Sequence, residues 1–320
     1  MKSKNKKPKI VVVGGGTGVF TVLTGLRGYP AELSAIATMA DDGGSTGMLR
    51  EDFGILPPGD VRRALVALSK TEDKILSALF TYRFEEGTGL HGHSFGNLML
   101  TALERLVGSF EGAIEAASKI LGVEGSVIPV SLAPGKLFAE LEDGQIIKGE
   151  ANIDIPSHDG KLRIERIWLE PKLKLNPSAK KAILGADLVV IGPGDLYTSL
   201  LPNILVGGMP EALKKTKAKI AYVTNLMTKF GETNNFEATD FLEAVEKHVG
   251  PGVLDYVVAN NERPSPARLR AYVKERASLV ELERKNFSAN PLLVSAPLIR
   301  AKGFIRHDPE KLARVLWELV

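Results

Sequence analysis

Two glycine-rich segments each follow a short apolar run and have residue types that can hold a phosphate. Their candidate ligand-binding residues are Gly14, Gly15, Gly16, Thr17, Gly18, Gly192, Gly194, Tyr197 and Thr198. Glycine turns let backbone N–H groups approach an anion, and the start of a following helix adds a favourable partial positive charge. Neither segment has the spacing of a dinucleotide fingerprint or a Walker A loop. We expect one extended, phosphate-bearing ligand; the alternative is a pair of plain turns.

An acidic segment, Asp41, Asp42, Gly43, Gly44 and Ser45, follows the second apolar run. Adjacent carboxylates can accept hydrogen bonds from sugar hydroxyls, and they can also hold a magnesium ion that bridges phosphates. Asp42 is the candidate metal ligand, provided that the ligand comes with magnesium. The alternative is an acidic turn at the surface of the protein.

Polar residues in the next part of the chain are candidates for contacts with an anion or a sugar. Arg62 falls in the first turn of a predicted helix, where the helix dipole disfavours a cation unless an anion lies nearby. Asp60 is predicted to cap that helix. His93 and Asn97 are expected to hydrogen-bond the ligand or an adjoining loop, since 5 histidines and no cysteine argue against a metal cage. Plain surface arginines and a structural helix start are the alternatives.

The C-terminal half supplies four further candidates. Asn225 and Thr228 follow another apolar run, where they can hydrogen-bond a base or a sugar. Tyr272 can stack on a base, and Arg306 can pair with a phosphate just before the last helix, which is predicted to start at Asp308. The alternatives are a plain helix-face tyrosine and a surface cation. No catalytic residue can be assigned, since no nucleophile elbow, zinc-binding helix or catalytic triad is recognisable.

The order of the elements predicts a Rossmann-like α/β fold with a doubly wound, mainly parallel sheet. Apolar runs typical of buried parallel strands occur at residues 10–13, 33–39, 187–191, 220–224 and 255–259. Helical patterns fill residues 60–121, with a break near 86–92. Residues 126–170 change to an alternating pattern and predict a small antiparallel insertion, with a hairpin at 136–150. In such folds ligands bind at the carboxyl edge of the strands, where the glycine-rich and acidic segments begin.

Composition narrows the class of protein. The chain has 320 residues, 44% of them hydrophobic and 25% charged, as in ordinary globular proteins. The absence of cysteine excludes disulfide scaffolds, thiolate metal sites and cysteine nucleophiles, and it fits a cytoplasmic protein. A net charge of +3 is too balanced for a dedicated nucleic-acid binder. No apolar stretch is long enough for a membrane span, and no secretion signal is recognisable.

The chain is expected to consist of a short basic tail and one domain. Five lysines fall within residues 1–9, which we interpret as a solvated terminus; contact with nucleic acid or anionic lipid is the alternative. Residues 10–320 are predicted to form a single domain, because no linker divides them. The oligomeric state stays open, with a homo-oligomer as one outcome.

In combination these segments resemble the YvcK-type gluconeogenesis factors, which are related to the 2-phospho-L-lactate transferases. The resemblance is carried by residues 14–18, 41–47, 57–62, 92–98, 191–199 and 225–233. It implies a Rossmann-like cytoplasmic protein that binds UDP-sugars such as UDP-N-acetylglucosamine and supports cell shape and wall synthesis on gluconeogenic carbon sources. The transferase branch moves phospholactate from a guanosine diphosphate carrier to a deazaflavin with magnesium.

The acidic segment places the resemblance in the gluconeogenesis-factor branch, and three positions depart from it. Residues 41–47 followed by 57–60 look like that branch. Lys229-Phe230 stands where the resemblance leads us to expect Gln-Pro, and Asp195 where we expect Ser, so the loops near the ligand are expected to differ in shape. The expected function is therefore a nucleotide-sugar-binding regulatory protein, and the alternative is a phospholactate-type transferase.

Overall fold

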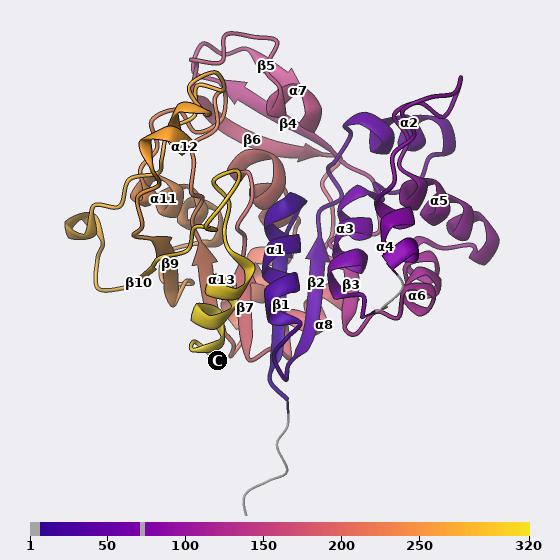
Figure 1. Cartoon of the computed structure of the whole chain (residues 1–320), viewed down its shortest axis with the longest axis horizontal. Helices are drawn as coiled ribbons and strands as arrows, with labels where there is room; N and C mark the ends of the chain where they lie inside the picture. Colours follow the sequence, from indigo (N-terminus) through magenta and orange to yellow (C-terminus); the bar gives the residue numbers. More distant parts are fainter. Residues whose placement is uncertain (1–6, 71–73) are drawn as a thin grey trace, which may run out of the picture.

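A seven-stranded parallel sheet forms the centre of the protein (Figure 1). The computed structural model describes residues 7–70 and 74–320. The strands lie in the order β10-β9-β8-β7-β1-β2-β3. Their bounds are β1 Lys9–Gly14, β2 Glu32–Ala37, β3 Ser126–Pro129, β7 Leu188–Ile191, β8 Lys219–Val223, β9 Tyr256–Asn260 and β10 Leu292–Ala296. The predicted doubly wound α/β fold is confirmed.

The strand order reverses between β1 and β7, which are neighbours in the sheet. From β1 the chain builds outward through β2 and β3, and then returns to β7 to build the other half. Such a switch point opens a crevice at the carboxyl ends of the two strands, and ligands of open α/β sheets bind there. Both glycine-rich segments follow these two strands directly, so the topology brings them together.

Helices flank the sheet. Their bounds are α1 Gly16–Leu26, α2 Gly44–Phe53, α3 Gly59–Leu68, α4 Lys74–Thr81, α5 Phe95–Val107, α6 Phe110–Leu121, α8 Pro177–Leu184, α9 Leu201–Ile204, α10 Met209–Lys215, α11 Ala238–Val249, α12 Pro266–Arg270 and α13 Pro309–Trp317. Helix α1 packs between α3 and α13, and in Figure 1 it lies in front of the strands. The predicted helical block 60–121 is therefore α3 to α6, and its break is the loop before α5. Asp308 caps α13 by accepting from two backbone N–H groups, as predicted.

A small antiparallel sheet rises above the carboxyl edge (Figure 1). It consists of β4 Lys136–Leu141, β5 Ile146–Lys148 and β6 Ile164–Glu170, and the short helix α7 Glu150–Asp154 follows β5. The expected start at residue 126 is corrected by the strand pairing, because β3 pairs in parallel with β2 and belongs to the main sheet. The insertion thus begins after β3 and places α7 over the crevice.

The burial of each strand explains whether it could be predicted from the sequence. Residues 10–13 of β1 and 188–191 of β7 are at most 2% exposed, because helices cover both faces of the sheet. The sequence analysis does not predict strand β10; it is an edge strand whose apolar run, Leu292-Leu293-Val294, is only three residues long and partly exposed. Within residues 7–70 and 74–320, no helix has the length and apolarity that crossing a membrane requires. Residues 1–6 of the expected tail lie outside the described residues, and Lys9 already belongs to β1.

Candidate functional site

Two cavities meet at the first turn of α1. The larger one, about 440 Å³, lies under the insertion and is rich in carboxylates; we call it the acidic cavity. The smaller one, about 180 Å³, lies toward residues 305–307; we call it the C-terminal cavity. Both are lined by Gly16, Thr17, Asp195 and Ser199. A ligand that spans both cavities must therefore pass the N-terminus of α1.

The two glycine-rich segments pack so closely that side chains would separate them. A Cβ on Gly18 would lie 1.9 Å from the carbonyl oxygen of Pro193, and a Cβ on Gly15 would lie 2.3 Å from an oxygen of Asp60. Gly16 has a φ of +67°, which favours glycine. Gly15, the N-cap residue of α1, has no side chain with which to cap the helix. The first turn of α1 thus lies at the crevice beside the second glycine loop, and a phosphate cradle there stays a prediction.

Asp60 takes one of the N–H groups at that helix start. Its Oδ1 accepts a hydrogen bond from Gly16 N at 2.9 Å and lies 3.1 Å from Arg63 Nη1. The prediction that Asp60 caps its own helix is wrong: α3 begins at Gly59 after Pro58, and Asp60 reaches across to α1 instead. A phosphate in this crevice would consequently use the first-turn N–H groups beyond Gly16.

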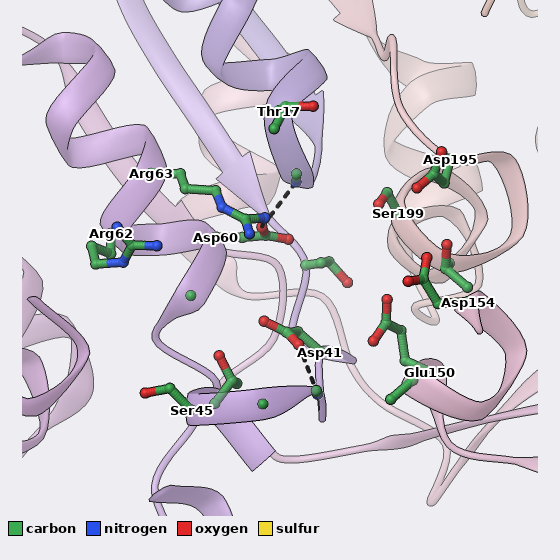
Figure 2. Close-up of a pocket in the computed structure, with 18 of the residues that line it drawn as sticks. Thr17, Asp41, Ser45, Asp60, Arg62, Arg63, Glu150, Asp154, Asp195 and Ser199 are labelled. Atoms are coloured by element: carbon green, nitrogen blue, oxygen red, sulfur yellow. Dashed lines mark hydrogen bonds and ion pairs between the residues drawn. The ribbon is translucent and has the colours of Figure 1, made fainter. Parts of the chain in front are cut away.

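Carboxylates crowd the acidic cavity (Figure 2). Burial, and then the charge of Asp60, raise the pKa of Asp41 to about 6. Burial, and then the charge of Asp41, raise the pKa of Glu150 to about 9. At neutral pH Glu150 is therefore protonated and can donate a hydrogen bond, whereas Asp41 is mostly an acceptor. Figure 2 shows Asp41, Asp60 and Glu150 around the same space.

Asp42 does not line the acidic cavity. Its Oδ1 accepts a hydrogen bond from Ala151 N at 2.9 Å and so fastens the start of α7 to the loop after β2. Asp41, its neighbour, faces the cavity together with Gly43, Gly44 and Ser45. The carboxylates that line this cavity are Asp41, Asp60, Glu150, Asp154 and Asp195, and the first three lie away from the Lys229 side chain. The sequence singled out Asp42 because adjacent aspartates cannot be told apart by type.

Ser45, His93 and Asn97 form one buried cluster beside the acidic cavity. Ser45 Oγ lies 3.3 Å from His93 Nδ1 and accepts from Asn97 Nδ2 at 3.3 Å. Arg62 Nε donates to Asn97 Oδ1 at 2.9 Å, and Arg62 Nη1 donates to Phe80 O at 3.2 Å. Burial lowers the pKa of Arg62 to about 10. Acceptors inside the protein therefore bind the Arg62 side chain in the first turn of α3. Its position there needs no external anion.

Replacing Arg62 is expected to destabilise the fold, and replacing its neighbour is not. The variant Arg62→Met leaves Asn97 Oδ1 and Phe80 O without their donor, at about 1–3 kcal/mol each. Arg63, whose side chain is 40% exposed, serves as the matched control. Arg63→Met is expected to change the free energy of unfolding by less than about 1 kcal/mol. Urea denaturation measures both, and equal losses in the two variants contradict the assignment.

A lysine surrounded by acids lies between the insertion and the second glycine loop and contacts both. Lys229 Nζ contacts Asp154 and lies 3.0 Å from both Asp195 Oδ2 and Glu232 Oε1. We call these four residues the Lys229 cluster. Lys229 and Asp195 are two of the three positions that depart from the family resemblance, and they contact each other. The cluster was not predicted from the sequence, because Asp154 and Asp195 lie 75 and 34 residues from Lys229.

Glu232 of this cluster also engages two of the predicted ligand-binding residues. Thr198 Oγ1 and Tyr197 N each donate to Glu232 at 3.1 Å, at the start of the π-helical turn η1 Leu196–Leu200. Glu232 is 4% exposed. Thr198 lines the acidic cavity but its hydroxyl proton is directed to Glu232, and the ring of Tyr197 packs against the core.

The C-terminal cavity gathers Asn225, Arg306 and His307 beside Gly194. Among the described residues, Asn225 Oδ1 and His307 Nε2 are buried without a hydrogen-bond partner. Burial lowers the pKa of His307 to about 4, so its ring is neutral at physiological pH. Unpartnered buried polar atoms carry an energetic cost that a ligand can relieve. Asn225 and Arg306 thus lie where the sequence analysis expected them, and His307 joins them.

Thr228 and Tyr272 lie outside the lining of both cavities. Thr228 Oγ1 accepts from Ser278 N at 2.9 Å. The Tyr272 hydroxyl accepts from Ile305 N at 2.7 Å, and its ring packs against a small apolar cluster. Tyr272 therefore holds the backbone next to Arg306 rather than offering its ring to a ligand.

Comparisons with known proteins agree with this geometry. The family described as 2-phospho-L-lactate transferase CofD matches residues 10–297. The gluconeogenesis factor of Bacillus subtilis is 41% identical over 318 residues, which cover 98% of this chain and 99% of that protein. The one from Halalkalibacterium halodurans is 42% identical over 316 residues, covering 98% and 97%. A crystal structure of a UPF0052 family protein from Bacillus halodurans has a TM-score of 0.93 at 40% identity, covering 98% of this chain and all of that one.

The doubly wound sheet, with two glycine loops lining a crevice at its switch point, defines a protein of the Rossmann-like α/β class. Fold alone does not fix the function of such proteins. The chain belongs to the CofD family and, within it, to the gluconeogenesis factors of the YvcK type. The family resemblance stated from the sequence is confirmed.

Proposed function

We propose that this gluconeogenesis factor is a cytoplasmic regulatory protein that binds a nucleotide sugar such as UDP-N-acetylglucosamine. The observation that carries the proposal is the pair of cavities joined at the first turn of α1. A nucleotide sugar has two polar ends separated by a diphosphate, so its shape matches two polar cavities on either side of a helix N-terminus. In the cell this binding would support shape and wall synthesis on gluconeogenic carbon sources.

Each part of the ligand has suitable partners. The diphosphate would meet the N–H groups of Thr17 and Gly18 and the facing loop at Gly194. The base would enter the C-terminal cavity, where Asn225 and His307 hold unpartnered polar atoms. The sugar would enter the acidic cavity, whose ionised and protonated carboxyls can accept from and donate to hydroxyl groups.

The acidic cavity also suits a magnesium ion carried with the diphosphate. Mg²⁺ prefers carboxylate oxygens and phosphate oxygens as ligands. Asp41, Asp60 and Glu150 supply such oxygens. Burial, and then the charges of neighbouring acids, raise the pKa of Asp41 and Glu150, and a bound cation would offset both effects. The ion would neutralise charge between these acids and the phosphates.

Arg306→Ala is expected to weaken UDP-N-acetylglucosamine binding about tenfold or more, because a charge-assisted hydrogen bond contributes about 1.5–3 kcal/mol. Arg306 lines the C-terminal cavity and is exposed, so its removal leaves the core intact. Arg300→Ala, an exposed arginine of the same loop outside both cavities, is the matched control. Titration calorimetry gives both affinities, with uridine and N-acetylglucosamine alone as ligand controls. A parent protein that binds no UDP-sugar contradicts the proposal.

The family match to a phospholactate transferase favours one second candidate, an enzyme of that type. Its acceptor would be a deazaflavin and its donor a guanosine diphosphate carrier. We expect no product when the protein is incubated with both and magnesium, because no base or nucleophile for the transfer is recognisable. Steady turnover that is lost in Asp41→Asn, a carboxylate that faces the acidic cavity, would replace the binding proposal by the enzymatic one.

A further inference from the structure

The Lys229 ammonium is contacted by acids from three separate segments. Asp154 ends α7 of the insertion, Asp195 begins η1 after the second glycine loop, and Glu232 lies in the loop after β8. The ligand oxygens of these three acids all lie within 4.8 Å of one another. That spacing is compact enough to surround a single cation, and the ammonium group of Lys229 is a cation supplied by the chain itself.

Burial makes this arrangement more than a surface ion pair. The side chain of Lys229 is 27% exposed and that of Glu232 is fully buried. Burial alone would lower the pKa of Lys229, but the charges of Glu232, Asp195 and Asp154 outweigh it and raise that pKa above its usual value. Lys229 therefore stays charged at any physiological pH. Removing the cation would leave carboxylates at short range with no counter-charge, which is strongly unfavourable.

The cluster joins the insertion to the second glycine loop within one wall of the acidic cavity. Figure 2 shows Glu150, Asp154 and Asp195 along that side of the cavity, with Asp60 and Arg63 across from them. Asp154 and Asp195 both line the cavity. The start of α7 is tethered through Asp42, and Lys229 adds a tether at its end, next to the buried Ile153.

We propose that Lys229 is a positioning residue, a built-in cation that fixes the end of α7 against the second glycine loop and keeps divalent metal ions out of the acid triad Asp154, Asp195 and Glu232. Lys229 fixes the shape of one wall of the acidic cavity and would touch no ligand itself. Any effect of that wall on ligand affinity rests on the proposed function, but the structural role of Lys229 does not.

Hydrogen exchange of the ligand-free protein tests the structural role. In Lys229→Met the amides of residues 150–155 and 195–200 should exchange about tenfold faster or more, which corresponds to about 1.4 kcal/mol. Amides of the β1 and β7 core should keep their parental protection. Lys219→Met removes an exposed partner of Asp255 at the opposite edge of the sheet and serves as the matched control. Unchanged exchange in both segments overturns the proposal.

Asp154→Asn keeps the test decisive if Lys229→Met fails to fold. This variant removes the charge that pairs Lys229 with the insertion, and it leaves Lys229 paired with Asp195 and Glu232. Exchange should then rise in residues 150–155 but not in 195–200. Equal exchange in the variant and the parent would mean that other contacts hold α7, and the positioning role of Lys229 would be refuted.

Manganese binding supplies a readout that a merely structural lysine would not change. Electron paramagnetic resonance should detect one Mn²⁺ site in Lys229→Met beyond any in the parent, and the additional change Asp195→Asn should remove it. The gained site would show that the ammonium group occupies the place of a metal ion. A parent site that disappears in Asp195→Asn, or no gained site in Lys229→Met, contradicts the exclusion of metal. Neither measurement uses a nucleotide sugar, so failure of the proposed function would leave both results unaffected.

Discussion

Gly18→Ala is expected to reduce nucleotide-sugar affinity about 100-fold or more, because losing two charge-assisted hydrogen bonds to the diphosphate costs about 3 kcal/mol or more. The added Cβ would lie 1.9 Å from the Pro193 carbonyl oxygen, a backbone atom that cannot rotate away. Helix α1 and the second glycine loop must therefore move apart, which separates the two groups of N–H donors proposed for the diphosphate. Overpacking of this kind also lowers stability, by about 1–3 kcal/mol.

Gly28→Ala is the matched control for this change. Gly28 follows the end of α1, and a Cβ there would meet its nearest neighbour, the Gly25 carbonyl oxygen, at an ordinary 3.7 Å. Calorimetry with UDP-N-acetylglucosamine and thermal unfolding should separate the two variants clearly. If Gly18→Ala binds the ligand as the parent does, the diphosphate does not lie between the glycine loops.

Glu150→Gln is expected to stabilise the protein at alkaline pH and to have little effect in acid. The folded-state pKa of Glu150 is raised from about 4.5 to about 9, so folding disfavours its charged form. A raised carboxyl pKa contributes stability that is present below pH 4.5 and is lost as pH rises through 9. Glutamine does not titrate, so the variant avoids this loss.

The difference should reach the order of 2–4 kcal/mol near pH 9, since one pKa unit corresponds to about 1.4 kcal/mol and solvent at the cavity mouth reduces the full value. Urea denaturation of both proteins from about pH 4 to 9, in the presence of a chelator, measures it. The exposed Glu142 in the hairpin turn provides the control Glu142→Gln. A constant difference across the pH range would show that Glu150 is not buried among the other acids.

The strands that build the crevice could be predicted because they are buried on both faces. Residues 10–13 and 188–191 are continuous apolar runs followed by glycine, a pattern that few other structures produce. Strand β10 was not predicted because its apolar run, Leu292-Leu293-Val294, is only three residues long and ends at Ser295. Local sequence patterns thus predict the strands in which every residue is buried.

Residues of the candidate site could be predicted only where they directly follow a strand of the main sheet. The glycine loops follow β1 and β7 at the switch point and Asn225 follows the adjacent strand β8, so topology alone brings them together. The contact of Asp60 with Gly16 and that of Arg62 with Asn97 could not be predicted, because these partners lie 44 and 35 residues away. The same holds for Lys229, whose acids lie on the insertion and on the second glycine loop. Spacing in the sequence carries no information on such pairings.

The crevice joins segments that lie far apart in the chain, so its walls are synthesised at different times. The first glycine loop, residues 14–18, precedes Arg306 and His307 by nearly 290 residues. Helix α13, which follows His307 directly, packs against α1. A nascent chain can therefore form the first half of the sheet early, yet it lacks one wall of the C-terminal cavity until residues 306 and 307 have been added. Chains that terminate before residue 306 would carry both glycine loops and still lack that wall of the crevice.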